Sequence, residues 1–333
     1  MTSVDPRIGL LGVGAYLPSR IMSNEEWTQY VDTSPEWIFS RTGIERRRIA
    51  ADDETTSSLA AAAALDALQR ASMTVAEIAE IIVATDTPEV TSPDTAAFVQ
   101  HRLGAPEIPA WDMAGSGCAG FVQALDVARA RVLLRGAPVL VIGVELLSRR
   151  FNWKDRNTAV LFGDGAGAAV VGTGPRTARI VAATAGTDGS KTGILGIEVG
   201  GSRRPFTLEE AVREGHKTLT MDGRQVFREA VRRMSAAARE VLRQAGVTFA
   251  DVALAVPHQA NARILQAVAE SLGIPPERVA SNVHEYGNIG SASIPVALWH
   301  AENENRIRPG DLVLLTAFGA GFHWSAMLLE YPR

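Results

Sequence analysis

The sequence lacks several features that would place it in a specialised class of protein. It contains one cysteine, which excludes an internal disulfide and a thiolate metal cluster. Its longest apolar runs, such as 138-PVLVIGV-144, are far shorter than the roughly 20 residues that span a bilayer. The N-terminus has neither the basic region nor the sustained apolar segment of a signal peptide. We therefore expect a cytoplasmic protein.

An excess of charge of one sign is also missing. The chain has 33 Lys and Arg against 37 Asp and Glu, a net charge of −4, which argues against nonspecific nucleic-acid binding. With 46% hydrophobic residues over 333 positions, the chain can bury a large core, either as one large domain or as two fused halves.

Short apolar segments alternate with helical stretches, a pattern typical of an α/β protein with a largely buried sheet. The linker 172-GTGP-175 is the best boundary, giving halves 1–172 and 173–333. Each half has a strand–turn–helix with reactive residues at the turn. The polar, Gly-rich segment 189–220 is too long for a simple connector and predicts a flap over a site. Strands are expected near 80–87, 108–113, 138–145, 179–188, 252–257, 311–318 and 322–331, and helices near 55–71, 93–104, 118–136, 223–245, 261–273 and 291–305.

The lone cysteine, Cys118, stands among small residues in 113-MAGSGCAGFVQAL-125, where a strand turns into a helix. At a helix N-terminus the macrodipole and unpaired backbone N–H groups favour a thiolate, which predicts a lowered pKa and a reactive nucleophile. A buried cysteine that acts as a small apolar residue is the commoner fate of a lone Cys, so the nucleophile needs partners.

Two polar residues of the second half are candidate partners. His258 in 256-VPHQANARI-264 follows a strand, and Asn288 in 284-HEYGNIGSASIP-295 lies in a Gly-flanked turn. Each has a structural alternative: His258 could cap the next helix with Asn261, and Asn288 could adopt the left-handed conformation in a turn. The histidines show no metal-ligand spacing, so no metal site is expected.

Glycine clusters are a further feature. Neither 163-GDGAG-167 nor 9-GLLGVG-14 fits a phosphate-binding or dinucleotide-binding motif, so both are interpreted as tight turns and close packing. The C-terminal 317-AFGAGFHW-324 can aim a backbone N–H at a developing oxyanion.

Taken together, these motifs resemble those of 3-oxoacyl-[acyl-carrier-protein] synthase III. The resemblance runs from about residue 7 to the C-terminus and rests on GCAGF, PHQAN, EYGNIGSASIP and FGAGF in this order, with 36-EWIFSRTGIERRRIA-50 and 155-DRNTAVLFGDGAGA-168. It implies the thiolase-like fold, two similar α/β halves in a five-layered αβαβα sandwich, usually as a homodimer.

The resemblance also implies a two-step reaction without a cofactor. Cys118 takes the acyl group from an acyl-CoA, and malonyl-acyl-carrier protein then loses CO₂ and attacks the Cys118 thioester. His258 and Asn288 would donate hydrogen bonds to the enolate, and the backbone N–H groups of Cys118 and Ala320 would form the oxyanion hole. Each such donor contributes ~3 kcal/mol to lowering the barrier.

Substrate contacts carry over from the same resemblance. It implies CoA-binding positions at Trp37, Arg41, Arg156, Arg224, Phe227 and Asn261, carrier-protein docking positions at Arg228, Gln259 and Arg263, and acyl-pocket positions at Ser92 and Phe318. A solvated helix face is the competing interpretation for the stripe Arg224, Arg228 and Arg232. The basic run Arg46, Arg47 and Arg48 is interpreted as a solvated loop.

The sequence departs from the family pattern at three places. Ala320 replaces a glycine, which keeps the backbone donor but restricts its conformation. Ser92 replaces an aromatic residue that helps to shape the acyl pocket, in family examples from the neighbouring subunit, which suggests room for primers larger than acetyl. Glu270 and Ser271 stand where lysines can occur, which weakens the expected docking patch.

Other functions remain open at this point. An acyltransferase of the same fold with a small-molecule acceptor would keep Cys118 and His258, and a non-catalytic partner subunit would keep the scaffold. Degradative thiolases use a second cysteine, and a papain-like hydrolase would show a different local signature around its nucleophile, so both are disfavoured.

Overall fold

The computed structural model of the protein describes residues 7–207, 209 and 219–333, and its described strands form one continuous nine-stranded sheet in the order β11-β12-β13-β8-β1-β7-β6-β4-β5. The strands are β1 (Ile8–Tyr16), β4 (Glu80–Thr85), β5 (Ala110–Ala114), β6 (Val139–Leu146), β7 (Asp164–Thr173), β8 (Ala178–Thr187), β11 (Val252–Pro257), β12 (Leu312–Gly319) and β13 (His323–Glu330). The two-pair contact of β1 with β8, Gly9 with Arg179 and Leu10 with Ala178, joins two sheets that otherwise belong to separate halves.

The two halves repeat one strand arrangement. The first half has the order β5-β4-β6-β7-β1, with β4 parallel to β5 and β6. The second has β11-β12-β13-β8, with β11 parallel to β12, and a parallel bridge from Ala255 to Val279 occupies the place that β5 has in the first. This repeat was only suggested by the sequence, and the change from one half to the other falls between β7 and β8.

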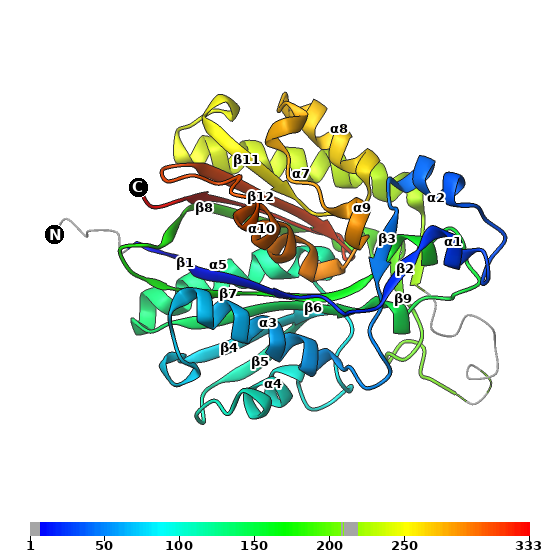
Figure 1. Ribbon diagram of the computed structural model, residues 1–333, viewed down its shortest axis with the longest axis horizontal. Helices are drawn as coiled ribbons and strands as arrows, with labels where there is room; N and C mark the ends of the chain where they lie inside the picture. Colours follow the sequence, from blue (N-terminus) through cyan, green and yellow to red (C-terminus); the bar gives the residue numbers. More distant parts are fainter. Residues whose placement is uncertain (1–6, 208, 210–218) are drawn as a thin grey trace.

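Helices cover both sheets and separate them. The main helices are α2 (Pro35–Thr42), α3 (Thr56–Ala71), α4 (Thr95–Leu103), α5 (Gly120–Arg135), α7 (Gly223–Ala245), α8 (Ala262–Leu272) and α10 (Ser293–Asn303). Helices α3 and α4 pack on the first sheet, and α7, with α8 against it, packs on the second (Figure 1). Helices α5 and α10 contact strands of both halves and form the middle layer, which completes the expected αβαβα order.

Local sequence explains where these helices begin. Thr55 and Ser58 form a reciprocal capping box at α3, and Asp222 accepts backbone N–H bonds from Arg224 and Gln225 at α7. Asn261 caps α8 through a bond from Arg263 N. The predicted helix 223–245 and strand 252–257 match α7 and β11, and the other predicted elements agree to within a few residues at their ends.

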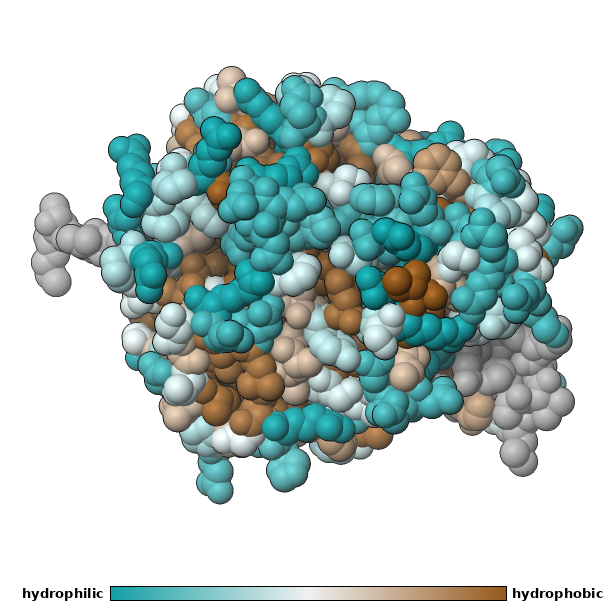
Figure 2. Space-filling view, viewed as in Figure 1, coloured by the Kyte–Doolittle hydropathy of each residue, from teal (hydrophilic) through white to brown (hydrophobic). Residues whose placement is uncertain are grey.

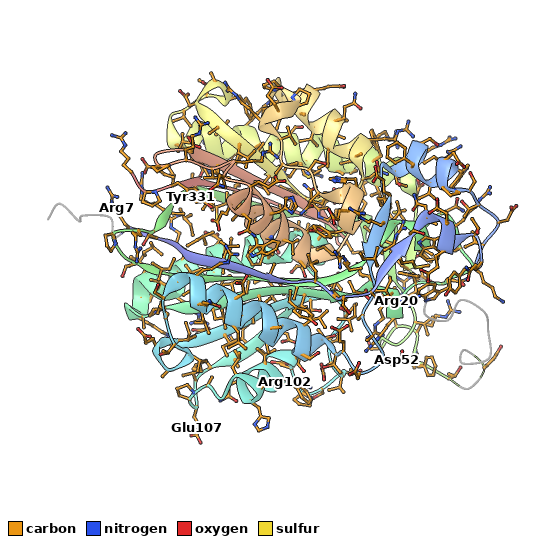
Figure 3. The ribbon with its side chains drawn as sticks, viewed as in Figure 1. Arg7, Arg20, Asp52, Arg102, Glu107 and Tyr331 are labelled. Atoms are coloured by element: carbon orange, nitrogen blue, oxygen red, sulfur yellow. The ribbon has the colours of Figure 1, made fainter. Side chains whose placement is uncertain are left out.

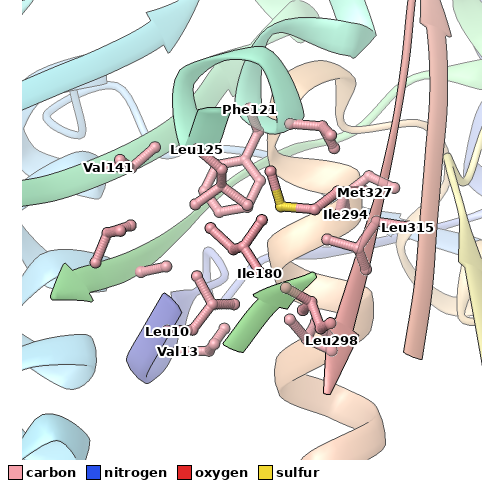
Figure 4. Close-up of a cluster of buried hydrophobic side chains, with 14 of the residues drawn as sticks. Leu10, Val13, Phe121, Leu125, Val141, Ile180, Ile294, Leu298, Leu315 and Met327 are labelled. Carbon is pink, nitrogen blue, oxygen red and sulfur yellow. The ribbon is translucent and has the colours of Figure 1, made fainter. Parts of the chain in front are cut away.

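The core between the layers is apolar and draws on both halves. Figure 4 shows Phe121 and Leu125 of α5 and Ile294 and Leu298 of α10 with strand residues such as Met327, all of them buried. Close packing also requires small residues. A Cβ at Gly14 in β1 would lie 2.1 Å from Ala67 N of α3. This is the close packing expected for 9–14. The segment lies within strand β1, however, rather than in the expected turn.

The surface is predominantly polar. On the face drawn in Figure 2 hydrophilic side chains prevail, and apolar ones gather mainly where β4 and β5 lie in Figure 1. Charged side chains such as Arg7 and Glu107 project at the edge of the molecule (Figure 3). Within the described ranges, every helix is too short or too polar to cross a bilayer.

The expected flap at 189–220 is described only in part, because residues 208 and 210–218 lie outside the described residues. Its described ends form a small antiparallel pair, β9 (Leu195–Ile197) with β10 (Leu219–Met221). Leu195, Leu219 and Met221 line the main cavity, so the described part of the segment borders the site.

Candidate active site

A cavity of about 1220 Å³ is lined by residues of both halves. It collects most of the residues singled out from the sequence: Cys118, His258, Asn288, Ala320, Trp37, Arg41, Arg156, Arg224, Phe227, Arg228, Asn261, Arg263 and Phe318. Residues far apart in the sequence meet at its wall. Asn261 Nδ2 donates a hydrogen bond to Arg41 O over 3.2 Å, although the two residues are 220 positions apart. The cavity is the candidate active site.

Cys118 lies in a short 3₁₀ turn, Gly117–Ala119, that leads directly into α5. Gly117 has φ +54°, and a Cβ there would lie 2.6 Å from Ala320 N. A Cβ on Gly319 would in turn lie 2.5 Å from Cys118 N. The turn that carries the sulfur and the turn that carries Ala320 are therefore in direct backbone contact, which only glycines at these two positions allow.

Asn288 is held rigidly against the sulfur. Its backbone N–H donates to Leu161 O over 2.8 Å and its carbonyl accepts from Gly163 N over 3.0 Å. Its side-chain Oδ1 accepts from Gly290 N over 2.9 Å and lies 4.0 Å from Cys118 Sγ. Because Gly290 N requires an acceptor, the oxygen side of the amide is fixed, and Nδ2 is left as a donor.

His258 is the first residue after β11, and its backbone N–H donates to Thr316 O over 2.8 Å. Its side chain is 2% exposed, and Nδ1 has no hydrogen-bond partner among the described residues. Burial lowers the pKa of His258 to about 3. The imidazole is therefore neutral at physiological pH and can act as a hydrogen-bond donor rather than as a cation.

The electrostatics of Cys118 differ from the sequence-based expectation. Burial raises the pKa of the thiol, and the charges of Asp86 and Glu145 raise it further. The Asn288 contact lowers the pKa of the thiol, and so does the backbone N–H of Cys118, the effect predicted for a helix start. Both effects are smaller than those that raise the pKa. The expected lowering of the pKa was wrong for the unliganded site: Cys118 is a protonated thiol here.

One rim of the cavity combines an indole ring with two guanidinium groups. The guanidinium carbon of Arg41 lies 5.1 Å from the centroid of the Trp37 ring of α2, and that of Arg156 lies 4.9 Å from the same centroid. Arg156 also donates to Asp32 O over 3.0 Å. Aromatic and cationic side chains at one rim are suited to a group that has both a flat ring and phosphates.

Basic side chains of α7 and α8 border the same opening. Arg224, Arg228 and Arg263 are exposed, and Phe227, 37% exposed, lies beside them. Arg232, the third member of the stripe, is paired with Glu229 through its guanidinium. The part of the stripe nearest the cavity thus keeps its charge at the surface.

Two expected contacts are placed elsewhere. Gln259 is 0% exposed, donates to Pro257 O and Ala280 O, and accepts from Asn282 N. Its expected role in carrier-protein docking was therefore wrong, because a fully buried side chain cannot contact a docked protein. Ser92 is exposed and lies outside the lining of the cavity, whereas Phe318 is buried at its wall. A contribution of Ser92 to the acyl pocket of a neighbouring subunit stays a prediction.

The basic run 46–48 is not a uniformly solvated loop. Arg47 is fully buried, donates to Asn24 Oδ1 over 2.8 Å and to Val160 O over 2.6 Å, and lies over Trp27. Burial lowers its pKa to about 9. Arg47 thereby links the 22–24 segment to Val160 at the cavity wall. This structural role could not be recognised in the sequence, where Arg47 stands between two other arginines.

Two carboxylic acids of the cavity were not predicted from the sequence. Asp86 directly follows β4, and Glu145 belongs to β6, a strand buried throughout. An acidic residue within the otherwise apolar run 139-VLVIGVEL-146 was the available signal. Among the residues that the structure describes, no group of His, Cys, Asp and Glu is arranged to hold a metal ion.

Comparisons with known proteins agree with this geometry. The family model for 3-oxoacyl-[acyl-carrier-protein (ACP)] synthase III matches residues 112–189, and the model for its C-terminal part matches residues 242–331. The beta-ketoacyl-[acyl-carrier-protein] synthase III of Oleidesulfovibrio alaskensis is 44% identical over 325 residues, covering 96% of this chain and 98% of that protein.

Solved structures give the same answer. The synthase III of Thermus thermophilus superposes with a TM-score of 0.89 at 46% identity, covering 97% of this chain and 99% of that one. A priming beta-ketosynthase from a polyketide biosynthetic pathway gives 0.90 at 37% identity, covering 98% and 97%. These likenesses confirm the expected thiolase-like fold and the resemblance drawn from the motifs. The chain belongs to the 3-oxoacyl-[acyl-carrier-protein] synthase III family of acyl-transferring condensing enzymes.

Proposed function

We propose that this chain condenses an acyl-CoA primer with malonyl-acyl-carrier protein, with loss of CO₂, to give a 3-oxoacyl-carrier protein. The reaction would initiate fatty-acid or related polyketide synthesis, and Cys118 would carry the acyl group between the two steps. The observation that carries the proposal is the 4.0 Å approach of Cys118 Sγ and Asn288 Oδ1 in a cavity also lined by His258.

In the first step, the sulfur of Cys118 attacks the thioester carbonyl, and CoA leaves. The contact between the Gly117 and Gly319 turns supports an oxyanion hole made of Cys118 N–H and Ala320 N–H. Trp37, Arg41 and Arg156 would bind the nucleotide end of CoA, whose ring and phosphates match an indole and two guanidiniums.

In the second step, malonyl-carrier protein loses CO₂ and its enolate attacks the acyl-Cys118 carbonyl. A neutral imidazole at His258 and the Nδ2 of Asn288 would stabilise the enolate oxygen, since a decarboxylation needs hydrogen-bond donors and no base at carbon. Arg228 and Arg263 would attract the acidic carrier protein to the opening. A homodimer, a cytoplasmic location and the absence of a resident cofactor are further parts of this proposal.

Intact-mass analysis tests the proposal. Pure protein is incubated with acetyl-, branched and medium-chain acyl-CoA, and Cys118→Ala is the control. We expect one acyl adduct, mapped to Cys118 and released by malonyl-carrier protein, and no adduct in the variant. Release by a small-molecule acceptor but not by malonyl-carrier protein would instead indicate an acyltransferase. A wide preference for acetyl-CoA would contradict the larger pocket suggested by Ser92.

A further inference from the structure

Two carboxyl groups line the cavity that contains Cys118. They belong to Asp86 and Glu145, and Glu145 is 1% exposed. Among the described residues, neither carboxylate forms a salt bridge with a lysine or arginine. Two acids buried in one site without a lysine or arginine partner destabilise the fold, because each resists ionisation next to the other. Such a pair is therefore a candidate for a role in function.

Hydrogen bonds fix the geometry of this acid pair, Asp86 and Glu145. The Glu145 oxygens accept from Asp86 N over 3.1 and 3.2 Å, from Thr87 Oγ1 over 2.7 Å and from Ser291 Oγ over 3.0 Å. Asp86 Oδ1 accepts from Gly115 N over 3.0 Å, and Gly117 N–H also stabilises the Asp86 carboxylate. The Asp86 carboxylate is thus bound to the backbone of the turn that immediately precedes Cys118.

The acid pair has the affinity for protons that the first step needs. Burial and the Asp86 charge raise the pKa of Glu145 to about 8, and burial raises the pKa of Asp86. Each carboxyl group therefore binds a proton more strongly than an ordinary acid does, and the two groups titrate together. His258, with a pKa of about 3, is a much weaker base. A base works best when its pKa lies near the operating pH.

The sulfur itself requires such a group. Cys118 is protonated in the unliganded site, because burial and the two carboxyl groups raise its pKa. Its proton must therefore leave as the sulfur attacks the thioester, and an acceptor within the cavity is required.

We propose that Asp86, supported by Glu145, accepts the Cys118 proton during acyl transfer and returns it to the departing CoA. The S–H bond of Cys118 breaks as its sulfur bonds the acyl carbon, and the proton passes to the Asp86 carboxylate, directly or across one water. When the acyl carbon–sulfur bond to CoA breaks, the same proton goes to the CoA thiolate, so the pair ends as it began. The inference rests on the proposed acyl transfer.

The internal repeat supports a functional role for Asp86 on separate grounds. Asp86 is the first residue after β4, and His258 is the first residue after β11, the strand with the same place in the other half. Both side chains line the one cavity. The same point of the repeated fold thus supplies an acid in the first half and a neutral imidazole in the second.

Other titratable groups share the cavity with Asp86. Glu145 comes from β6, Cys118 from the turn before α5, and His258 from the end of β11. The charge of His323 of β13 also acts on Asp86, and the Nδ1 of His323 is bonded to Thr187 Oγ1 at 2.8 Å. The pH dependence of acylation should therefore follow the acid pair and the thiol.

Asp86→Asn tests the inference, because asparagine keeps an oxygen for Gly115 N but accepts a proton poorly. Asp112→Asn is the matched control: Asp112 of β5 also binds two backbone N–H groups, Thr95 N at 2.7 Å and Ala96 N at 2.8 Å, and burial also raises its pKa, but it lies outside the cavity lining. Acylation is followed by rapid-quench intact mass at saturating acyl-CoA from pH 5.5 to 9, and thiol alkylation by iodoacetamide over the same range.

The two readouts should move in opposite directions. Loss of a general base slows acylation about 10²-fold or more in Asp86→Asn. Loss of the negative charge lowers the thiol pKa, so iodoacetamide, which needs only the thiolate, should react faster at a given pH. Asp112→Asn should leave both rates near wild type. A purely structural role for Asp86 would instead slow both reactions.

The outcomes separate this inference from the proposed function. If the wild-type protein forms no acyl adduct, the proposed function fails. If wild type is acylated and Asp86→Asn is acylated equally fast, only the role of Asp86 is overturned. Glu145→Gln gives a second readout should Asp86→Asn fold poorly: loss of the Glu145 charge should lower the pKa of the Cys118 thiol, so that alkylation begins at a lower pH, while acylation slows. Unchanged alkylation and acylation in this variant would contradict the support of Asp86 by Glu145.

Discussion

The two halves of this protein share one strand arrangement but supply opposite kinds of chemistry to a common cavity. The first half provides the thiol of Cys118 and the carboxyl groups of Asp86 and Glu145, all with raised pKa values. The second provides His258, whose pKa is lowered to about 3, and the amide of Asn288. In the proposed reaction, proton transfer is thus concentrated in the first half, and the neutral donors to the enolate come from the second.

The repeat also relates the turns that precede the central helices of the two halves. A 3₁₀ turn precedes the central helix in each half, Gly117–Ala119 before α5 and Gly290–Ala292 before α10. Cys118 stands in the first turn and Ser291 in the second, where its hydroxyl donates to Ala84 O over 2.8 Å and to Glu145. One turn carries the proposed nucleophile, and its counterpart binds Glu145 of the acid pair.

The largest expected effect removes the reactive atom of the first half. Cys118→Ala leaves no nucleophile, because the chain has no other cysteine. We expect complete loss of the acyl adduct and of condensation, measured by intact mass and by product formation. An adduct of undiminished yield in this variant would place the nucleophile elsewhere and end the comparison.

A smaller effect is expected at the rim formed by Trp37, Arg41 and Arg156, the proposed CoA contacts, which the first half provides. Trp37→Ala removes the ring that packs under two guanidinium groups, a contact worth roughly 1–2 kcal/mol when desolvated. We expect KM for acyl-CoA to rise roughly 10-fold with little change in kcat. Trp111→Phe, on β5 and outside the cavity lining, is the control. A fall in kcat at constant KM would contradict a binding role.

The basic opening belongs to the second half and should act more weakly. Arg228→Ala or Arg263→Ala removes one exposed charge, and exposed pairs contribute about 0.2–1 kcal/mol. KM for malonyl-carrier protein should rise a few-fold, and the difference from wild type should shrink with added salt. Arg243→Ala, at the far end of α7, serves as the control. A salt-independent effect would argue against electrostatic docking.

The smallest expected effect is a flat pH response in the second half. With a pKa of about 3, His258 stays neutral from pH 5 to 8, so decarboxylation should show no imidazole titration in that range. Folding stability should also depend on pH: because the unfolded chain binds the His258 proton near pH 6.5 and the folded protein does not, the free energy of unfolding should fall as pH drops from about 6.5 toward 3. Decarboxylation rates of the acylated enzyme test the first point, and a rise centred near pH 6.5 would contradict it.

The motifs of the sequence predicted the fold and the contact among distant residues well. Helix 223–245 had an Asp cap, strong helix formers and a terminal glycine, so local signals alone fixed α7. Local patterns made His258 and Asn288 candidate partners of Cys118, but only the family resemblance assigned the three residues to one site. No local pattern states that turns 140 and 170 positions away meet.

Other features depend on packing that sequence patterns do not reveal. Arg47 looked like one of three solvated arginines, yet only its neighbours reach the surface. The helix start at Cys118 does favour a thiolate, but burial and two carboxyl groups from other strands outweigh it. Gly14 was expected in a tight turn with close packing, and only the close packing is present: the glycine makes room for the backbone of helix α3.

The division between the halves is tested most directly by measuring both half-reactions in a variant with His258→Ala and Asn288→Ala combined. We expect the Cys118 adduct to form within a few-fold of the wild-type rate, while CO₂ release from malonyl-carrier protein falls by about 10³-fold or more. Equal losses of acylation and CO₂ release would contradict the account, since they would show that the second half serves both steps alike.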